Sequence, residues 1–520
     1  MGTKQFSNYE SLLTFTRASK GHALRPVSYG TELVTNGDFA TDSDWTKEAS
    51  WTISGGTATY DGAVHVETLF QNISLTTGKI IKISYTVKNV EAGKTAYFNV
   101  VGSPNASPLY KQYTNHTEGD YEIIATVEAG AVGLGFFALN SGTGGAFDLD
   151  NVSVKEVLFD QPDGTLTLFE HPDNIPRVEY DADGNRLGLL VEEARTNLWL
   201  HSQDMSEASL GGAGGTVTTD QYVAPDGTQT GDLVTMNSGE LYVYRGMTLS
   251  SPSNVAFTVS CYVKAVEANT SVNLRIGEFG GAAGAKFHDS GNTAISSTEW
   301  TRLDFTQTLE QSDRTQVQAV IRTTSQTSSL LIWGVQLEQG SFPTSYIKTT
   351  SSTATRSSEL ADVLVDNFGY NNSNEGTFVI HAKNLSYNPN GTDYPFLVRF
   401  DNATNSNDRL GIFLSEASGN LVAEIKRNNV TQMSPVFKTA TGGAVDEIVV
   451  AFAFAENDFA VSDDGDAVIT DTAGTLVPSS PIAKIGLGQA FNSVHMNAHI
   501  TSFQYYPRRL TNAQIEDLSS

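Results

Sequence analysis

Side chains that could carry out catalysis are few in this sequence, and they follow no familiar pattern. The nine histidines are scattered without a His-x-His or His-x-x-x-His pair, so neither a metal motif nor a triad is visible. The closest approach to paired carboxylates is Glu118-Gly119-Asp120-Tyr121-Glu122, because alternation along a strand places acids on one face, as hydrolysis of a glycosidic bond requires. Glu118 and Gly119 are typical of a turn, however, and we expect the protein not to be an enzyme.

Aromatic side chains offer a different chemistry, the binding of sugars. Rings with amide and carboxylate groups nearby form platforms for carbohydrate. Trp300 begins a predicted strand and Trp333 lies within one, so we expect both rings to be buried. Tyr242 and Tyr244 alternate along a predicted strand and therefore share one face. These two tyrosines are the predicted carbohydrate-binding residues.

Composition excludes several functional classes. The chain has 32 Lys and Arg against 58 Asp and Glu, a net charge of −26, which disfavours nucleic acid and anionic membranes as partners. The single cysteine, Cys261, allows neither an internal disulfide nor a Cys-based zinc site, and its alternating surroundings predict burial. The first residues, MGTKQFSNYESLL, lack the long apolar core expected of a signal peptide, and no apolar run of about 18 residues occurs in the sequence. We expect synthesis in the cytoplasm and no membrane insertion.

Period-two alternation of apolar residues, broken by Gly, Asn and Thr turns, recurs through the chain and predicts β-sandwiches. Residues 84–92 match residues 260–268 in order, and residues 151–155 match 334–338, which indicates two copies of one fold. Near the C-terminus Thr511 and Gln514 form a predicted capping box. We therefore predict an all-β fold of three β-sandwich (jelly-roll) domains in tandem with one short C-terminal helix.

One stretch lacks this repetitive character, LGLLVEEARTNLWLHSQD at residues 187–204. It resembles a segment of tailed-phage virion structural proteins of the tail-fibre and decoration type. The pieces FTRAS at 15–19, PRVEYDADG at 176–184 and PTSYI at 343–347 resemble neighbouring pieces of the same family. In such relatives the first two pieces follow each other closely, whereas here some 130 of the residues between them look like an inserted domain.

Two further resemblances concern single domains. Asn36-Gly37-Asp38-Phe39 followed by Trp45 is similar to the opening of jelly-roll carbohydrate-binding modules. That resemblance implies a structural calcium between the first and last strands, for which Asp38, Asp148 and Asp150 are the predicted metal ligands. Residues 499–514 resemble the final strand and helix of concanavalin A-like lectin/glucanase domains.

The predicted organisation follows from these matches. It comprises a lead-in at 1–30, a first jelly-roll domain at 31–157, a linker at 158–196, a second jelly-roll domain at 197–349 and a concanavalin A-like lectin domain at 350–520.

The resemblances imply a phage virion structural protein, a tail fibre, spike or head decoration, located in the virion and adhering to host cell-surface polysaccharide. The implied partners are other virion proteins and two further copies in a homotrimer. Two alternatives stay open, a purely structural decoration or spacer protein and, further behind, a glycan depolymerase.

Overall fold

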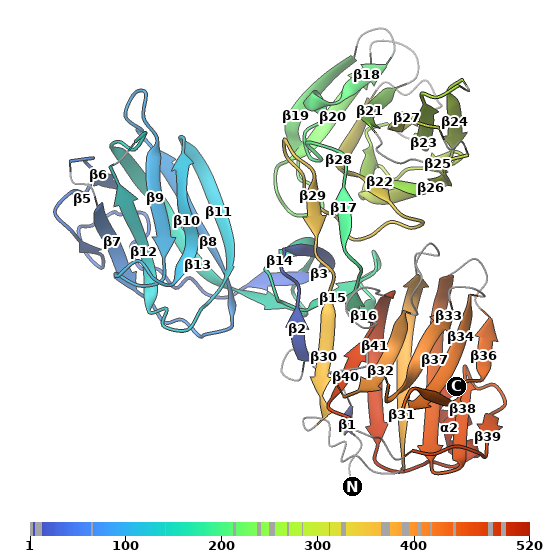
Figure 1. The fold of residues 1–520 in the computed structure, drawn as a ribbon. Coiled ribbons are helices and arrows are strands. Elements are labelled where there is room, and N and C mark those ends of the chain that lie inside the picture. The colour runs from blue at the N-terminus through green and yellow to red at the C-terminus, as the bar shows by residue number, and fades with distance from the viewer. Residues whose placement is uncertain are drawn as a thin grey trace. The chain divides into compact units, whose positions relative to one another are not determined.

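The computed structural model describes residues 4–5, 13–63, 66–140, 142–211, 215–236, 241–248, 255–267, 270–282, 284–310, 313–323, 329–365, 375–386, 395–402, 407–415, 419–439, 444–476, 482–489 and 496–520. The fold is all-β with one short C-terminal helix, as predicted (Figure 1). The chain forms two compact units, one of residues 25–166 and one of residues 1–24 with 167–520. Within the described residues, no helix has the length and apolar character needed to cross a bilayer.

The unit of residues 25–166 is a sandwich of two sheets. One sheet has the strand order β10-β9-β12-β7-β4, and the other has the order β11-β8-β13-β3-β14 with β6 beside β13 and β5 beside β6. Inward-facing side chains such as Leu69, Phe98 and Phe136 form its core. The strands are β3 (Gly21–Tyr29), β4 (Thr46–Lys47), β5 (Trp51–Ser54), β6 (Thr57–Tyr60), β7 (Val66–Asn72), β8 (Ile80–Lys88), β9 (Ala96–Val101), β10 (Leu109–His116), β11 (Gly119–Thr126), β12 (Gly133–Leu139), β13 (Phe147–Phe159) and β14 (Thr165–His171).

A second sandwich follows in the other unit. Its sheets have the orders β18-β21-β27-β23-β24, with β25 beside β23, and β19-β20-β28-β22-β26. Cys261 lies in its core, where burial raises the pKa of the thiol to about 12, so the prediction of a buried cysteine is confirmed. Trp333 is buried as predicted, whereas Trp300 is only partly so. The strands are β18 (Ser209–Gly211), β19 (Gly215–Tyr222), β20 (Gly231–Met236), β21 (Tyr242–Thr248), β22 (Ala256–Ala265), β23 (Ser271–Phe279), β24 (Lys286–Asp289), β25 (Thr293–Ala294), β26 (Thr301–Thr308), β27 (Gln316–Thr323) and β28 (Ser329–Gln339).

The two sandwiches share one plan, including one irregularity. β8 lies between β11 and β13 just as β22 lies between β26 and β28. In each pair with the closing strand the register slips once, and the extra residue has a positive φ, 51° at Asn151 and 63° at Gly334. Asn and Gly are the residues that tolerate this conformation best. The sequence match of 151–155 with 334–338 therefore aligns two β-bulges.

The last sandwich is completed by strands from earlier in the chain. Its sheets have the orders β15-β16-β41-β31-β37-β38-β39, with β1 beside β41, and β2-β30-β40-β32-β33-β34-β35, with β36 beside β34. Strands from segments 1–30 and 158–196 thus pair with strands near the C-terminus. The strands are β1 (Lys4–Gln5), β2 (Leu13–Thr16), β15 (Arg177–Tyr180), β16 (Arg186–Val191), β30 (Leu360–Leu364), β31 (Glu375–Ser386), β32 (Phe396–Asp401), β33 (Arg409–Ser415), β34 (Asn420–Arg427), β35 (Val430–Met433), β36 (Val436–Thr439), β37 (Ala444–Ala455), β38 (Asp458–Asp463), β39 (Ile469–Asp471), β40 (Lys484–Leu487) and β41 (Asn497–Tyr506).

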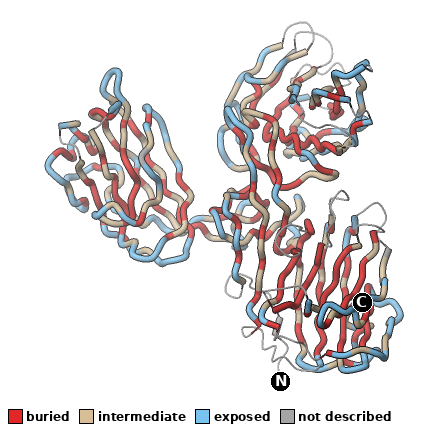
Figure 2. Tube along the Cα trace, in the orientation of Figure 1, coloured by how far each residue is buried: buried red, intermediate tan, exposed pale blue. Residues whose placement is uncertain are grey.

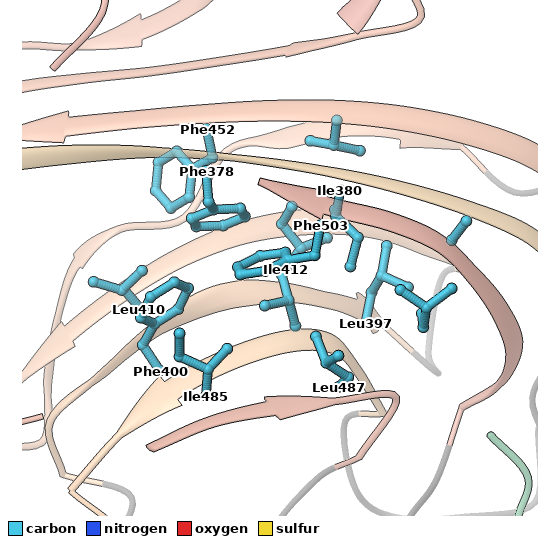
Figure 3. Close-up of a cluster of buried hydrophobic side chains, with 14 of the residues drawn as sticks. Phe378, Ile380, Leu397, Phe400, Leu410, Ile412, Phe452, Ile485, Leu487 and Phe503 are labelled. Atoms are coloured by element: carbon cyan, nitrogen blue, oxygen red, sulfur yellow. The ribbon is translucent and has the colours of Figure 1, made fainter. Parts of the chain in front are cut away.

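Apolar side chains from both sheets of this last sandwich meet between them. Phe378 packs against Phe452 and Phe400, with ring centroids 5.4 and 5.2 Å apart (Figure 3). Figure 2 shows that buried positions lie mainly on the strands and exposed positions mainly at the turns. Helix α2 (Asn512–Ser519) begins with the predicted capping box of Thr511 and Gln514.

A buried ion cluster forms around Glu192, which lies in the stretch 187–204, and we call this region the junction. The ion cluster consists of Arg17, Arg177, Arg356, Glu192 and Glu359, whose side chains are at most 5% exposed. Arg177 Nη2 lies 2.6 Å from Glu192 Oε2, and Arg177 Nε lies 2.8 Å from Glu359 Oε1. Burial would raise the pKa of Glu192, but the charges of Arg356 and Arg177 outweigh burial and hold it below its ordinary value.

The ion cluster also fixes a segment that covers the second sandwich. This sealing segment, residues 342–347, lies on the outer side of the sheet β19-β20-β28-β22-β26. Ser345 donates from its N–H to Glu192 Oε1 at 2.8 Å, and the Tyr346 ring lies 4.6 Å from that of Trp333. The Thr344 N–H donates to buried Glu338 Oε2 at 3.0 Å. Short strands β17 (Arg195–Asn197) and β29 (Ala354–Arg356) pair beside it.

Candidate functional site

Tyr242 and Tyr244 lie on the outer side of the sheet β18-β21-β27-β23-β24. Val243 between them belongs to the core of the second sandwich, and the two tyrosines are half-buried on the opposite face. Strand alternation therefore places both rings on one surface, as predicted. Their role in sugar binding stays a prediction.

Register across the sheet brings further side chains beside these two tyrosines. Tyr242 is paired with Arg322 of β27, which is paired in turn with Asn273 of β23. One row further on, Arg275 of β23 is paired with Asp289 of β24. The Tyr–Arg face, as we name this surface, consists of Tyr242, Tyr244, Asn273, Arg275, Phe287, Asp289, Gln316, Gln318 and Arg322.

Two guanidinium groups on the Tyr–Arg face share one carboxylate. Arg275 donates from Nε and Nη2 to the two oxygens of Asp289, at 2.9 and 3.0 Å. Arg322 Nη2 lies 3.5 Å from Asp289 Oδ1, and its Nε donates to Asn273 Oδ1 at 3.3 Å. The hydrogen bond from Arg275 lowers the pKa of Asp289 and outweighs the effect of burial. Asp289 is therefore ionised at neutral pH.

Aromatic rings lie beside both arginines. The Arg275 Cζ is 5.0 Å from the centroid of the Phe287 ring, and the Arg322 Cζ is 5.9 Å from that of Tyr242. Both distances lie within the range of cation–π attraction. Gly277 lies under these groups, where an added Cβ would come within 2.7 Å of the Phe279 ring. The glycine therefore leaves room for that ring to lie across the sheet.

The edge strand β24 is anchored from the inner side by a buried carboxylate. Glu278 accepts hydrogen bonds from His288 Nε2 at 2.7 Å and from Arg314 Nε at 3.1 Å. Burial would raise the pKa of Glu278, but hydrogen bonds from the Glu310 N–H, His288 and Arg314 lower it. This network holds the strand that presents Phe287 and Asp289 on the outer side.

The corresponding face of the first sandwich is partly filled by its own side chains. On the outer side of the sheet β10-β9-β12-β7-β4, Thr68, Phe70, Asn99 and Val101 are at most 5% exposed. Phe70 lies over Gly133 and Gly135, where an added Cβ would come within 2.6 Å of its ring. Val66, Tyr97, Phe137 and Leu139 on the same face are partly exposed, so the two faces differ mainly in charge and in the glycines that Phe70 covers.

The three aspartates predicted as calcium ligands each have other partners. Asp148 and Asp150 share the outer side of β13, as the alternation predicts, but Asp148 accepts from Thr59 Oγ1 and Asn89 Nδ2, at 2.5 and 2.7 Å. Asp150 pairs with Lys88 at 2.5 Å, and exposed Asp38 accepts from the Ala40 N–H at 3.3 Å. Among the described residues no group of three or more His, Cys, Asp or Glu is placed to hold a metal ion. Calcium binding stays a prediction.

The acids of residues 118–122 are also engaged. Glu118 accepts from the Val90 N–H at 3.1 Å, Asp120 from Thr86 Oγ1 at 2.6 Å, and Glu122 pairs with Lys82 at 2.5 Å. Gly119 begins β11, so the turn expected at 118–119 agrees with the strand boundary.

A charged cluster on the last sandwich has no counterpart among the sequence predictions. Arg399 pairs with Asp401 and Arg409 pairs with Glu424, each at 2.6 Å, on the outer side of the sheet that contains β32, β33 and β34. These ion pairs are almost fully buried, and Phe396 beside them is 4% exposed. The spacing of Arg399 and Asp401 predicts a shared face, but Arg409 and Glu424 join them only through long-range register.

Neither a protein-family model nor a curated protein matches the chain. Solved structures with partial similarity include the tandem CBM22 domains of Paenibacillus barcinonensis Xyn10C, at 11% identity over 60% of this chain and 98% of that chain, with a TM-score of 0.23. Domain 4 of the arabinanase AbnA of Geobacillus stearothermophilus, in complex with arabinotriose, has 16% identity over 35% of this chain and 83% of that chain, with a TM-score of 0.23. The active domain of tailspike protein 4 of bacteriophage CBA120 has 10% identity over 28% of this chain and 21% of that chain, with a TM-score of 0.22. TM-scores this low do not establish a common fold, so function has to be argued from the residues of this chain.

Proposed function

We propose that the protein binds glycans through the Tyr–Arg face of its second sandwich. The observation that carries the proposal is that four neighbouring strands present rings, amides and guanidinium groups together on an accessible sheet surface. The equivalent surface of the first sandwich, built on the same strand plan, is partly filled by Phe70, which lies over Gly133 and Gly135.

The chemistry of this face suits sugars. A pyranose ring has apolar C–H patches that pack on aromatic rings such as Tyr242 and Tyr244, and hydroxyls that need fixed hydrogen-bonding partners. Gln316 and Gln318 supply amides that both donate and accept, while the arginines donate only. A row of such groups along an open sheet fits an extended polysaccharide chain better than a small isolated molecule.

The test uses the full chain on a glycan array, followed by calorimetry with the polysaccharides retained. Replacing both tyrosines, Tyr242→Ala with Tyr244→Ala, should weaken binding by about 100-fold, because each lost ring contributes on the order of 1–2 kcal/mol at an interface. Tyr29→Ala is the matched control, since Tyr29 is an exposed tyrosine in the first sandwich. Equal affinity of the double variant and the control would contradict the proposal.

We propose further that this binding serves a phage virion structural protein, a tail fibre, spike or head decoration that joins other virion proteins as a homotrimer. The support is the resemblance of residues 187–204 to that class. Immunogold labelling of intact particles tests the location, and sedimentation tests the trimer. A protein found on particles without any glycan ligand would instead support the spacer role, and shortening of a polysaccharide on incubation would support a depolymerase.

A further inference from the structure

The Tyr–Arg face has an excess of positive charge in a strongly acidic protein. The chain carries a net charge of −26, whereas the described residues that define this face include two arginines and one carboxylate. A surface meant for neutral sugar needs no such excess, because amides and hydroxyls hydrogen-bond to hydroxyls equally well. The charge of the face therefore carries information about the ligand.

The two arginines differ in how Asp289 engages them. Arg275 uses two nitrogens on the two oxygens of Asp289, which is the strong bidentate arrangement. Arg322 reaches the same carboxylate only at 3.5 Å, beyond the usual length of a hydrogen bond, and holds Asn273 at 3.3 Å. Arg322 is thus positioned by Asn273 and Tyr242 while its charge is only partly compensated.

The location of Arg322 in the sheet allows it to contact a sugar chain bound on this face. It is paired across the sheet with Tyr242 on one side and with Asn273 on the other, so it lies between an aromatic ring and an amide. Its side chain is 17% exposed, compared with 35% for Asp289. A sugar packed on Tyr242 therefore brings its substituents next to the guanidinium group.

We propose that the Tyr–Arg face selects polysaccharides whose sugars carry carboxylates, with Arg322 as the residue that determines this specificity. The inference rests on the proposed glycan binding and names the chemical class of the ligand. A ligand carboxylate accepts from Arg322, while Gln316 and Gln318 remain for hydroxyls. Elsewhere the acidic surface of the protein repels such a polymer, so productive contact concentrates on this face.

The test compares each acidic polymer with the same polymer after its carboxyl groups are reduced to alcohols. Polygalacturonate, alginate and hyaluronan are titrated in both forms into the full-length protein. We expect at least one acidic form to bind, with its reduced form weaker by about tenfold or more, since a charge-assisted bond contributes on the order of 1.5–3 kcal/mol. Added salt should weaken the acidic form only.

Two variants locate the selectivity. Arg322→Gln should bring the acidic and reduced forms to similar affinity, whereas Gln318→Ala should weaken both forms alike. Arg322→Lys should retain part of the preference, because a point charge replaces a planar fork. A Tm unchanged from that of the wild type shows that each variant is folded.

The outcomes separate the inference from the function on which it rests. Equal binding of acidic and reduced polymers, or binding of neutral glycans alone on the array, overturns the acidic specificity and leaves glycan binding intact. A preference for carboxylates that survives Arg322→Gln overturns the role of Arg322. Absence of binding to every glycan removes the proposed function and the inference with it.

Discussion

The first and second sandwiches place different residues at equivalent positions of the same sheet. The row Thr68–Phe137–Asn99 of the first sandwich corresponds by strand pairing to Tyr244–Val320–Arg275 of the second. The adjoining pair Val66–Leu139 corresponds to Tyr242–Arg322. The rows of the first sandwich are uncharged, whereas those of the second combine tyrosines with arginines, although the strand order is common to both.

On the opposite sheets, the second sandwich is covered and the first is exposed. In the second sandwich the sealing segment covers this side, where Glu338 is fully buried. In the first sandwich the corresponding positions surround an open hollow, lined by Tyr29, Lys82, Ser84, Glu122, Ser153 and Lys155. The sealing segment thus covers a side of the second sandwich whose counterpart in the first meets solvent. The comparison teaches that a common strand plan does not decide which side of a sandwich meets a ligand.

The largest effect on this difference between the sandwiches is expected when Glu192, which holds the sealing segment in place, is replaced. Glu192→Gln leaves Arg177 and Arg356 buried with one carboxylate fewer, so the free energy of unfolding should fall by about 3–5 kcal/mol. Chemical denaturation measures the change. Glu170→Gln is the control, because Glu170 pairs with Lys20 on the surface and its loss should cost less than about 1 kcal/mol. Similar losses in the two variants would refute the role assigned to the cluster.

Acid pH should act on the same junction. The folded pKa values of Glu192 and Glu359 lie below the ordinary value of 4.5, since neighbouring arginines outweigh burial. Their stabilisation is therefore fully present above about pH 4.5 and is lost as pH falls through the folded values. Thermal unfolding followed from pH 7 to pH 3 should show this loss, and Glu192→Gln should show a shallower dependence. If stability fell with pH in the same way in the variant and the wild type, Glu192 would not be the source of the acid sensitivity.

A direct contrast between the two sandwiches comes from Glu338 of the second. Glu338→Ala removes the acceptor for the Thr344 N–H and hydroxyl, and should destabilise the protein by about 2–3 kcal/mol, because hydrogen bonds to a buried charged group are lost. Differential scanning calorimetry measures the effect. A change below about 0.5 kcal/mol would mean that the segment is held by other contacts.

Glycan binding should weaken when one row of residues in the second sandwich is replaced by the corresponding row of the first. Tyr244→Thr, Val320→Phe and Arg275→Asn together give the second sandwich the row found in the first. We expect affinity for the retained polysaccharide to fall by about 30- to 100-fold, since the Tyr244 ring and the Arg275 guanidinium are both lost. Calorimetry measures the affinity, and the Tm checks that the fold is kept. Full retention of binding would show that the ligand sits elsewhere.

The smallest effect is expected at Lys155, the position of the first sandwich that corresponds to Glu338. Lys155→Ala should change the free energy of unfolding by no more than about 0.5 kcal/mol, because Lys155 lies on a solvated side without an ion pair among the described residues. Measured beside Glu338→Ala, it calibrates how much the sealing segment contributes. A loss comparable to that of Glu338→Ala would show that the hollow is not open.

Local patterns in the sequence predicted much of this. Period two placed Tyr242 with Tyr244 and Asp148 with Asp150 on shared faces, and the capping box predicted where α2 begins. These features depend on neighbours in sequence. The partners of those residues do not, because Asp150 meets Lys88 and Tyr242 meets Arg322 only through register between distant strands.

The junction at 187–204 shows the same limit. Its motif with Glu192 was visible, but the partners Arg17 and Glu359 lie 342 residues apart in the chain. No pattern in a single sequence links such positions, since the link is created by the fold itself. For the Tyr–Arg face, the sequence likewise predicted the two tyrosines but not the arginines beside them.

The paired bulges at Asn151 and Gly334 point to common ancestry. A backbone kink is difficult to acquire twice at one place, whereas surface side chains change freely, so the kink is the older character. After a duplication, one copy of the domain can lose its ligand-binding residues while the other copy keeps or gains them. Any further relatives of this module should then be recognised by the position of the kink before any resemblance of their exposed residues.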